Sequence, residues 1–295
     1  MTPAKLALSV AIVTRNRPES LQMTLDSLAK QLPRPFEILI SDDSNTEAMV
    51  ASNQQLAQQY GCRYLSGPQR GLYANRNFVA RHMAGTHLRT MDDDHEFPEN
   101  HLQVCMEAIA ADDSAVWTIG EYFPSDAERP LPSPVPGQLH PRGFSYPPPD
   151  MAQYYGISCG ASIYPRAVVD DGILNLESYK FGILYLEYGA RLLNSGYRIK
   201  CLDRTYVIHH MVESSVTSRE IIDSARVFSM LMLSFLHRKT LGNQLLTSAQ
   251  ILSEIFRGRY SPQLVLNAYR EYKLRAKELK ESKAKASAGR PAARR

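Results

Sequence analysis

The feature that most constrains the fold is a run of nine residues at 6–14, in which apolar side chains follow one another almost without interruption. A strand with one wet face would alternate apolar and polar residues, so this run predicts a strand buried on both faces of a parallel sheet. Pro18 then begins a segment with leucines at helical spacing, which predicts an amphipathic helix over 18–31.

Strand and helix continue to alternate along the first part of the chain. Strands are predicted at 36–40 and 63–65, with a helix at 46–60 between them. This order is typical of an α/β fold with an open, mostly parallel central sheet flanked by helices. Ligands of such sheets bind beyond the carboxyl ends of the strands, and polar residues follow the first two strands at 15–17 and 41–45.

Three consecutive aspartates, Asp92, Asp93 and Asp94, follow a further strand-like segment and precede Pro98. Adjacent ionised carboxylates repel one another, so a folded chain rarely gathers three of them without a compensating cation. Mg²⁺ or Mn²⁺ would supply that charge, because both take oxygen ligands and share them with substrate phosphates. Strand alternation predicts that Asp92 and Asp94 point one way and Asp93 the other, and a solvated acidic turn is the alternative.

Two segments on either side of the aspartates suggest contacts with a ligand. A helix predicted over 71–83 begins at Gly71, and Arg76 in its first turns carries a charge suited to a diphosphate; a routine helix start with a surface arginine is the alternative. The segment 124–150 holds nine of the 18 prolines. It is an irregular excursion, either a wall of an acceptor pocket or an insertion without a role.

The other elements of the first two thirds are predicted from their periodicity. Small and β-prone residues at 154–163 indicate a strand packed closely against another element. Further helices are predicted at 98–111 and 178–194, and further strands at 116–120, 197–202 and 206–210.

The C-terminal part is predicted to be helical. A capping box at 217–220 begins a helix whose apolar run, 227–236, either packs on the domain or rests in a membrane surface beside the basic residues that follow. Two more helices follow at 244–257 and 261–281, and the tail after them has no apolar period, which predicts disorder.

The net charge of +4 is unevenly placed. Residues 273–295 carry nine Lys/Arg and two Glu, so the rest of the chain is slightly acidic, which argues against a nucleic-acid-binding core. The four cysteines form no CxxC pair, and no apolar run approaches the roughly 20 residues of a membrane span or has the pattern of a signal peptide. We therefore expect a cytoplasmic protein with reduced thiols.

The order of the motifs is more specific than any one of them. A strand ending in TRNRP, a second ending in SDDSN, a GxxxxRN helix start, an MDDD segment, a Gly-Ala strand and a Gly-Tyr-x-Ile strand follow in sequence. Over residues 6–215 this order resembles the inverting, family-two glycosyltransferases of the GT-A fold. The resemblance implies a catalytic domain at 1–215 that contains the proline-rich loop. The patterns described above add a helical extension at 216–282 and a disordered basic tail at 283–295.

The resemblance also implies a binding site for a nucleotide-sugar donor. Thr14 and Arg15 would lie by the nucleoside, Asp43 with Asp42 beside it would face the base, and Arg76 would face the diphosphate. A base N–H requires an acceptor such as a carboxylate, which is consistent with that assignment.

By the same resemblance, Asp92 and Asp94 match the DxD motif that binds Mn²⁺ or Mg²⁺ on the diphosphate, with Asp94 as the first choice for direct contact. Asp93 lies in the same donor-binding segment. His209 or His210 matches a position where some relatives place a metal-ligating or acceptor-side histidine, and strand alternation directs one of the two toward a site.

The second half departs from the family pattern at the catalytic base. The usual Glu-Asp pair is replaced by Leu184 and Tyr185, neither of which accepts a proton at neutral pH. Glu187 lies about one helical turn further along and is our candidate base, with Glu177 in reserve. A packed or solvated helix carboxylate is the alternative for Glu187.

These features support a metal-dependent transfer of a sugar, with inversion, from a UDP-, dTDP- or GDP-sugar to a hydroxyl of a glycan, lipid-linked or small-molecule acceptor. Nucleic acid is not an expected partner, whereas the C-terminal helices and basic tail are expected to contact the cytoplasmic face of a membrane. A non-catalytic adapter that binds a nucleotide or glycan is the first alternative. A nucleotidyltransferase is the second, faintly supported by Arg15 and Arg17.

Overall fold

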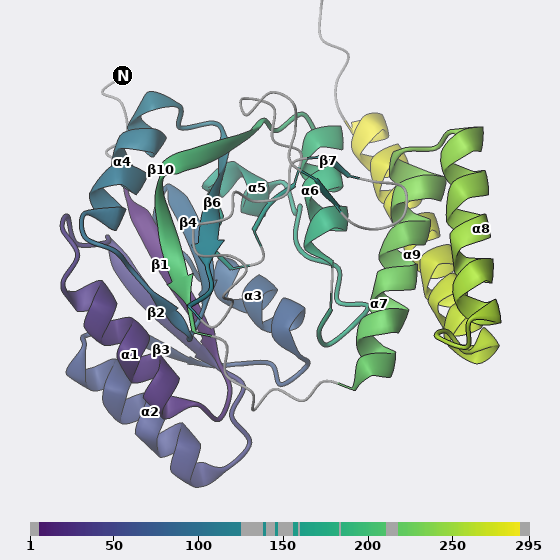
Figure 1. The fold of residues 1–295 in the computed structure, drawn as a ribbon. Coiled ribbons are helices and arrows are strands. Elements are labelled where there is room, and N and C mark those ends of the chain that lie inside the picture. The colour runs from purple at the N-terminus through teal and green to yellow at the C-terminus, as the bar shows by residue number, and fades with distance from the viewer. Residues whose placement is uncertain are drawn as a thin grey trace, which may run out of the picture.

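A single eight-stranded sheet forms the centre of the protein in a computed structural model (Figure 1). The structure describes residues 6–124, 138–139, 145–146, 156–158, 160–182, 184–210 and 218–289. In spatial order the strands are β3 (Arg63–Ser66), β2 (Glu37–Asp42), β1 (Leu8–Thr14), β4 (His87–Asp92), β9 (Ile163–Pro165), β6 (Val116–Tyr122), β10 (Ile199–His209) and β5 (His95–Glu96).

Most neighbouring strands are parallel, which confirms the fold class predicted from the alternation of strands and helices. β3, β2, β1 and β4 form one parallel set, and β6 and β10 form a second parallel pair. β9 lies antiparallel between β4 and β6 and joins the two sets, and β5 pairs antiparallel with β10 at the edge. The strand predicted at 154–163 is shorter and later than expected, because β9 begins at Ile163; neither its antiparallel direction nor the strand β5 was predicted.

Helices cover both faces of the sheet (Figure 1). On one face lie α1 (Pro18–Ala29), α2 (Glu47–Gln59) and α4 (His101–Ala111), and on the other lie α3 (Leu72–Ala80), α5 (Arg166–Asp170) and α6 (Tyr185–Asn194). The apolar run of β1 explains this arrangement. Leu8, Val10 and Ile12 pack with the first group of helices, while Ala11 and Val13 pack with α3, so every residue of the strand is buried.

The register of the central strands brings their carboxyl ends to one edge. Thr14 of β1 pairs with Asp42 of β2, and Val13 pairs with Asp92 of β4. The polar residues that follow these three strands therefore lie together, as the sequence predicted from the rule for parallel sheets.

Two predicted elements of the second half need correction. The strands expected at 197–202 and 206–210 are one continuous strand, β10, with a register shift between Leu202 and Tyr206. The helix expected from residue 178 begins only at Tyr185. Gly182, which adopts a φ of 130° and packs against Ala225, interrupts the segment before that helix.

Several predicted features fall partly or wholly outside the described residues. Within the proline-rich segment 124–150, Pro124 and two short paired strands, β7 (Gln138–Leu139) and β8 (Ser145–Tyr146), are described. Thr217 also lies outside, and the helix expected there has Ser218 as its N-cap, with the serine hydroxyl accepting a hydrogen bond from the Ile221 amide at 3.4 Å. Cys159 lies outside too, and Cys62 and Cys105 are free thiols.

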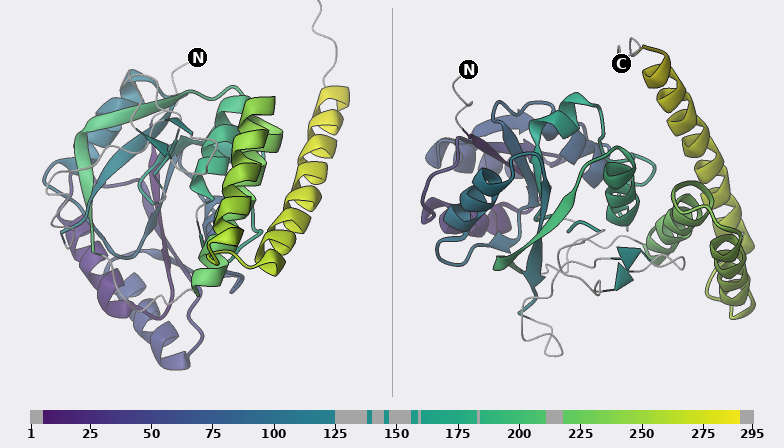
Figure 2. Two further views of the ribbon diagram at one scale, coloured as in Figure 1. Left: turned by 45° about the vertical axis from the view of Figure 1, so that its right-hand side comes forward. Right: turned by 90° about the horizontal axis from the view of Figure 1, so that it is seen from above.

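The C-terminal extension consists of α7 (Arg219–Met232), the π-helical turn η1 (Leu233–His237), α8 (Leu241–Phe256) and α9 (Pro262–Gly289) (Figure 2). Val227, Phe228 and Met232 are fully buried in a cluster that also contains Tyr73 of α3. The apolar run at 227–236 therefore packs on the protein rather than on a membrane.

The end of the chain differs in detail from the prediction. α9 continues to Gly289, past the boundary expected at 282. Among the described residues, no helix combines the length and the apolar character that crossing a bilayer requires.

Candidate metal centre and active site

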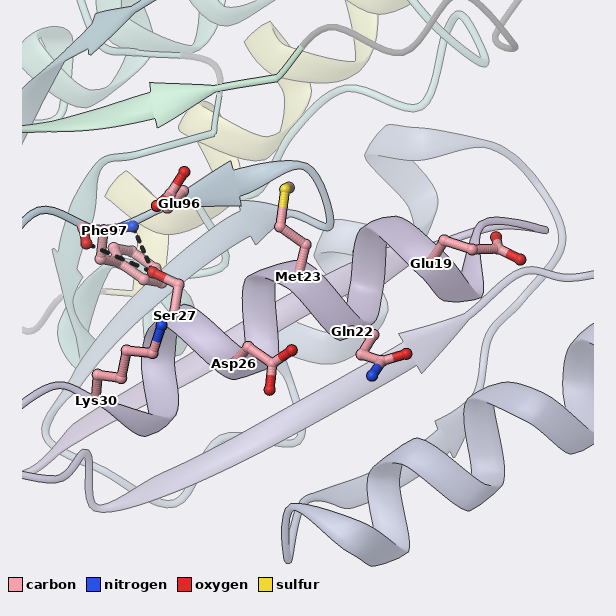
Figure 3. Close-up of a pocket in the computed structure, with 8 residues that line it drawn as sticks. All are labelled: Glu19, Gln22, Met23, Asp26, Ser27, Lys30, Glu96 and Phe97. Atoms are coloured by element: carbon pink, nitrogen blue, oxygen red, sulfur yellow. Dashed lines mark hydrogen bonds between the residues drawn. The ribbon is translucent and has the colours of Figure 1, made fainter.

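The three aspartates form a buried acidic turn at the carboxyl end of β4. The strand ends at Asp92, and Asp93 and Asp94 lead into β5. The backbone of the turn is fixed by α1, because the Thr24 hydroxyl donates to the Asp93 carbonyl at 2.8 Å. The Ser27 hydroxyl then accepts the Phe97 amide at 2.6 Å, a contact drawn in Figure 3.

Arg17, at the N-terminus of α1, is the cation that holds two of the three carboxylates. Its guanidinium pairs with Asp93 and with Asp94, the latter at 3.2 Å. Thr14 at the end of β1 donates its hydroxyl to Asp93 at 2.6 Å. Burial raises the pKa of Asp93 to about 7, against the opposing effects of Arg17 and the Thr14 hydrogen bond.

Asp92 is held by a different cation. Arg76 of α3, almost completely buried, donates to its carboxylate at 2.6 Å. Asp93 and Asp94 thus share one arginine, and Asp92 has another, which differs from the alternation expected for a strand. The reason is that the strand ends at Asp92, so the period of two does not extend through the turn.

A group of potential metal ligands lies beside this turn. Asp94, His95 and His209 each offer one ligand atom, and these atoms lie within 4.8 Å of one another. The pairing of β5 with β10 places His209 opposite His95 and explains why residues 114 positions apart meet. His209 was predicted as a ligand together with Asp92 and Asp94, whereas His95 was not predicted.

The hydrogen bonds of this group are incomplete. Both ring nitrogens of His95 are buried without a hydrogen-bond partner, and so is Oδ1 of Asp94, which lies 3.4 Å from Nε2 of His209. Unpartnered buried polar atoms cost free energy unless something else satisfies them. A divalent cation could bind Oδ1 of Asp94 together with one of the two ring nitrogens of His95, so these residues fit a metal.

Glu121 orients His209, one of the two histidines of this group. At the carboxyl end of β6, its carboxylate lies 3.1 Å from Nδ1 of His209, which leaves Nε2 directed to Asp94. A carboxylate behind a metal-ligating histidine is a common arrangement, because it fixes the ring and its tautomer. Sequence reasoning missed Glu121, although it follows the same rule about the ends of parallel strands.

The charges in the group are strongly perturbed. Burial disfavours the protonated imidazole of His209, but Asp94 and Glu121 outweigh it and raise the pKa of His209 to about 10. Burial opposes ionisation of Asp94 as well, yet the contact with His209 lowers its pKa to about 2. Complete burial, with His209 nearby, lowers the pKa of His95 to about 4, so that ring is neutral at pH 7 and able to bind a metal.

Gly160 permits the close packing of this region that the small residues at 154–163 had indicated. A Cβ atom there would lie 2.9 Å from Cε1 of His95 and 3.0 Å from a carboxylate oxygen of Asp92. Any larger residue would therefore displace the side chains of the candidate site.

The second acidic pair divides into two roles. Asp42 accepts hydrogen bonds from the Ser44 amide at 2.8 Å, the Asn53 amide group at 2.9 Å and the Tyr64 hydroxyl at 2.8 Å, so its carboxylate is occupied by the protein. Asp43, which is also buried, accepts the Gln69 amide at 2.8 Å, and burial raises the pKa of Asp43. Both carboxylates shape the loops that follow β2 and β3.

The remaining predicted residues lie in varied surroundings. Arg15 is exposed and close enough to influence the ionisation of Asp43. His210 pairs with Glu96 at 2.8 Å. Glu177 is held by Arg70 and by Asn77, each at 3.0 Å.

Glu187, the candidate base, is fully buried in α6 and is held by an arginine and a histidine. Its carboxylate accepts from Arg191 at 2.8 Å and lies 3.0 Å from Nε2 of His237 in η1. Burial favours the protonated form, but Arg191 and His237 hold the pKa of Glu187 below its usual value. A carboxylate in this state is a weak proton acceptor, so its surroundings favour a structural role; the role of base stays a prediction.

A separate pocket of about 380 Å³ lies along α1 (Figure 3). It is lined by Glu19, Gln22, Met23, Asp26, Ser27, Lys30, Glu96 and Phe97. None of these residues belongs to the group of Asp94, His95 and His209, so we do not assign the binding of a nucleotide-sugar donor to this pocket.

The fold and the acidic turn define a GT-A protein. The family model described as Glycosyl transferase family 2 matches residues 9–172, which is more than half of the chain. The chain therefore belongs to that family of glycosyltransferases. This confirms the family, the fold and the enzyme class that the order of motifs implied. Comparison with curated proteins finds no match.

Solved structures share the fold at low sequence identity. TarS 1–349 of S. aureus in complex with UDP-GlcNAc gives a TM-score of 0.63 at 17% identity, over 90% of this chain and 80% of the other. GalNAc-T7 with UDP, GalNAc and Mn²⁺ gives 0.64 at 17% identity, over 77% and 48%. The mannosyltransferase PcManGT of Pyrobaculum calidifontis with GDP-Man and Mn²⁺ gives 0.59 at 13%, over 98% and 83%. The match to a longer TarS chain covers 44% of that chain, so this protein spans about half the length of some of the structures it matches.

Replacing Gly160 with Ala is expected to weaken metal binding while leaving the fold intact. The added methyl group meets the ends of the His95 and Asp92 side chains, which shift instead of the backbone. We expect Mn²⁺ affinity, measured by titration calorimetry, to fall about tenfold. Gly242→Ala is the matched control, because a Cβ at Gly242 meets nothing within 4 Å. Equal affinities in the two variants would contradict the close packing described here.

Replacing Glu187 with Gln is expected to destabilise the protein. The change leaves the guanidinium of Arg191 without its anion and weakens the contact with His237, at a cost of about 3 kcal/mol in the free energy of unfolding. Urea denaturation measures it, and Glu107→Gln, which breaks an exposed ion pair with Arg204, is the control that leaves stability unchanged. Full stability combined with lost turnover would instead identify Glu187 as the base.

Proposed function

We propose that this chain transfers a sugar, with inversion, from a nucleotide-sugar donor to an acceptor hydroxyl with the help of a divalent cation. The observation that carries the proposal is the group of Asp94, His95 and His209 beside the acidic turn of a family-two chain, in which Asp94 and His95 have buried polar atoms without a hydrogen-bond partner. The acceptor class, whether glycan, lipid-linked or small molecule, is left as the sequence analysis gave it.

Mn²⁺ is the ion we assign to the site. Mg²⁺ prefers oxygen ligands, whereas this group offers two imidazoles with one carboxylate and has Asp92 nearby. Two of the structural neighbours, GalNAc-T7 and PcManGT, were solved with Mn²⁺. When bound, the ion would neutralise charge that develops on a departing diphosphate.

The protein's own residues would hold the two ends of the donor. Arg17 and Arg76 bring two guanidinium groups to the acidic turn, where a diphosphate would compete with the aspartates for them. Asp43 lies at the end of the neighbouring strand and would accept a base N–H. UDP, UDP-GlcNAc and GDP-Man are the nucleotides in the neighbouring structures, and each carries such an N–H.

A second candidate function, a binding protein without transferase activity, is favoured by the surroundings of the expected base. The usual acidic pair is replaced by Leu184 and Tyr185, and Glu187 is occupied by Arg191 and His237. Incubating the protein with UDP-GlcNAc or GDP-mannose and Mn²⁺ separates the two functions. A transferase releases the nucleoside diphosphate slowly by donor hydrolysis, whereas a binding protein binds the donor and releases none.

The affinity for Mn²⁺ is expected to rise with pH. Because the pKa of His209 is raised to about 10 in the metal-free protein, binding must displace its proton, and lower pH favours the protonated ring. The association constant should therefore increase about tenfold per pH unit between about pH 7 and 9. Calorimetry in buffers of different ionisation enthalpy measures the proton release. His210→Gln should keep this dependence, and a pH-independent affinity would exclude His209 as a ligand.

Replacing Asp94 with Asn is expected to remove the metal-dependent function. The change deletes an anionic ligand and the charge that orients His209. Mn²⁺ affinity should therefore fall at least about tenfold, which is the loss typical when a residue supporting a metal ligand is replaced. Mn²⁺-dependent donor hydrolysis should be lost. Asp113→Asn, an exposed aspartate outside the site, should behave as the parent protein. Unchanged Mn²⁺ affinity in Asp94→Asn would refute the metal assignment.

A further inference from the structure

α8 presents a continuous apolar face to solvent. Leu241, Leu245, Leu252 and Phe256 are 73%, 61%, 53% and 88% exposed. Their spacing of four, seven and four residues places them on one side of the helix. Four large exposed apolar side chains on one side of a helix are unusual for a protein that functions alone in water, and such patches mark contact surfaces.

The position of α8 explains why this face is free. The helix lies at the outer edge of the molecule, beside α7 and away from the central sheet (Figures 1 and 2). Thr247 and Ile251 are its buried residues, so a narrow inner stripe attaches it to the rest of the extension.

Positive charge surrounds the same helix. Glu254 is the single charged residue among the 16 of α8, and it pairs with Arg257 and Arg259, which follow the helix. Arg238 and Lys239 precede the helix, and these four basic residues are exposed, so positive charge remains in excess at its ends. The distribution extends further. Residues 238–282 carry nine Lys/Arg against four Glu, whereas residues 1–237 carry 20 Lys/Arg against 26 Asp/Glu.

We propose that the outward face of α8 docks on an anionic lipid bilayer. An interfacial helix of this kind buries its apolar side chains at the boundary between headgroups and acyl chains, while basic residues at its ends meet anionic headgroups. At about 1.5 Å per residue α8 is about 24 Å long, and it would lie along the surface rather than cross it. The sequence had suggested such a contact for the run at 227–236, which is buried.

Charge complementarity decides between this occupant and a second copy of the chain. Two copies meeting through α8 would bring two basic surfaces together, which costs free energy, whereas an anionic bilayer is attracted to the same residues. The docking surface is also separate from the acidic turn. A failure of the proposed transferase function would therefore leave this inference standing, and its own failure would not affect the transferase.

Co-sedimentation of the full chain with vesicles tests the proposal. Vesicles of equal parts phosphatidylglycerol and phosphatidylcholine should bind the protein, and vesicles of phosphatidylcholine alone should bind it much more weakly. A double variant, Leu252→Ser with Phe256→Ser, should lower the partition coefficient at least about tenfold, because the apolar contribution is lost. Phe36→Ser is the matched control, since Phe36 is 61% exposed on the acidic body, and it should not change binding.

Charge variants give a second measurement that does not depend on the apolar substitutions. Lys239→Gln and Arg257→Gln should each weaken binding to the anionic vesicles about fivefold, and added salt should weaken it in the parent protein. Circular dichroism would verify that each variant is folded. Three results would overturn the proposal: no binding to anionic vesicles, equal loss in Phe36→Ser, or a dimer, seen by analytical ultracentrifugation, that the double variant abolishes without any vesicle binding.

Discussion

The pairing of Arg17 with Asp93 and Asp94 is the interaction on which the candidate site depends. Three adjacent carboxylates at the end of a buried strand repel one another, and the protein offsets this with Arg17 on one side and Arg76 on the other. Both cations belong to helices that pack on opposite faces of the sheet. The acidic turn can therefore form before any metal ion arrives. A cation would then complete a group whose shape is already fixed, and the arginines would become available to a diphosphate that competes with the aspartates.

The sequence was sufficient to predict the part of the site that is built from local patterns. Short stretches of chain are enough to predict the buried run of β1, the helices after β1 and β2 and the acidic residues at the strand ends. The parallel register then brings those acidic residues to one edge of the sheet. His95 and Glu121 could not be predicted as partners of His209, because that contact depends on β10 lying between β6 and β5. No periodicity shows such an order. The strand alternation expected for the aspartates failed for a local reason, since β4 ends at Asp92.

The second half shows the limit of positional reasoning along a helix. Counting residues placed Glu187 one turn from the missing acidic pair, and the structure keeps it in the first turn of α6. Its burial and its contact with His237 follow from tertiary packing, because His237 comes from a π-helical turn of the extension, whereas Arg191 lies four residues further along the same helix. The carboxylate thus links the helical extension to the catalytic body. An insertion of a residue into η1 would displace His237 and leave Glu187 with Arg191 as its remaining partner, which would couple the stability of the two parts.

The segregation of charge connects the two ends of the molecule. The body carries excess acid, including the turn where a cation is proposed, while the extension carries excess base around an apolar face. A membrane with anionic headgroups would attract the extension and repel the acidic body, so electrostatics would orient the protein as well as bind it. The basic residues of the C-terminal region led the sequence analysis to expect this contact there, but it assigned the contact to the most apolar run, 227–236. Hydropathy alone favours the segment that the fold buries, whereas a docking helix needs its apolar residues on the side that the fold leaves exposed.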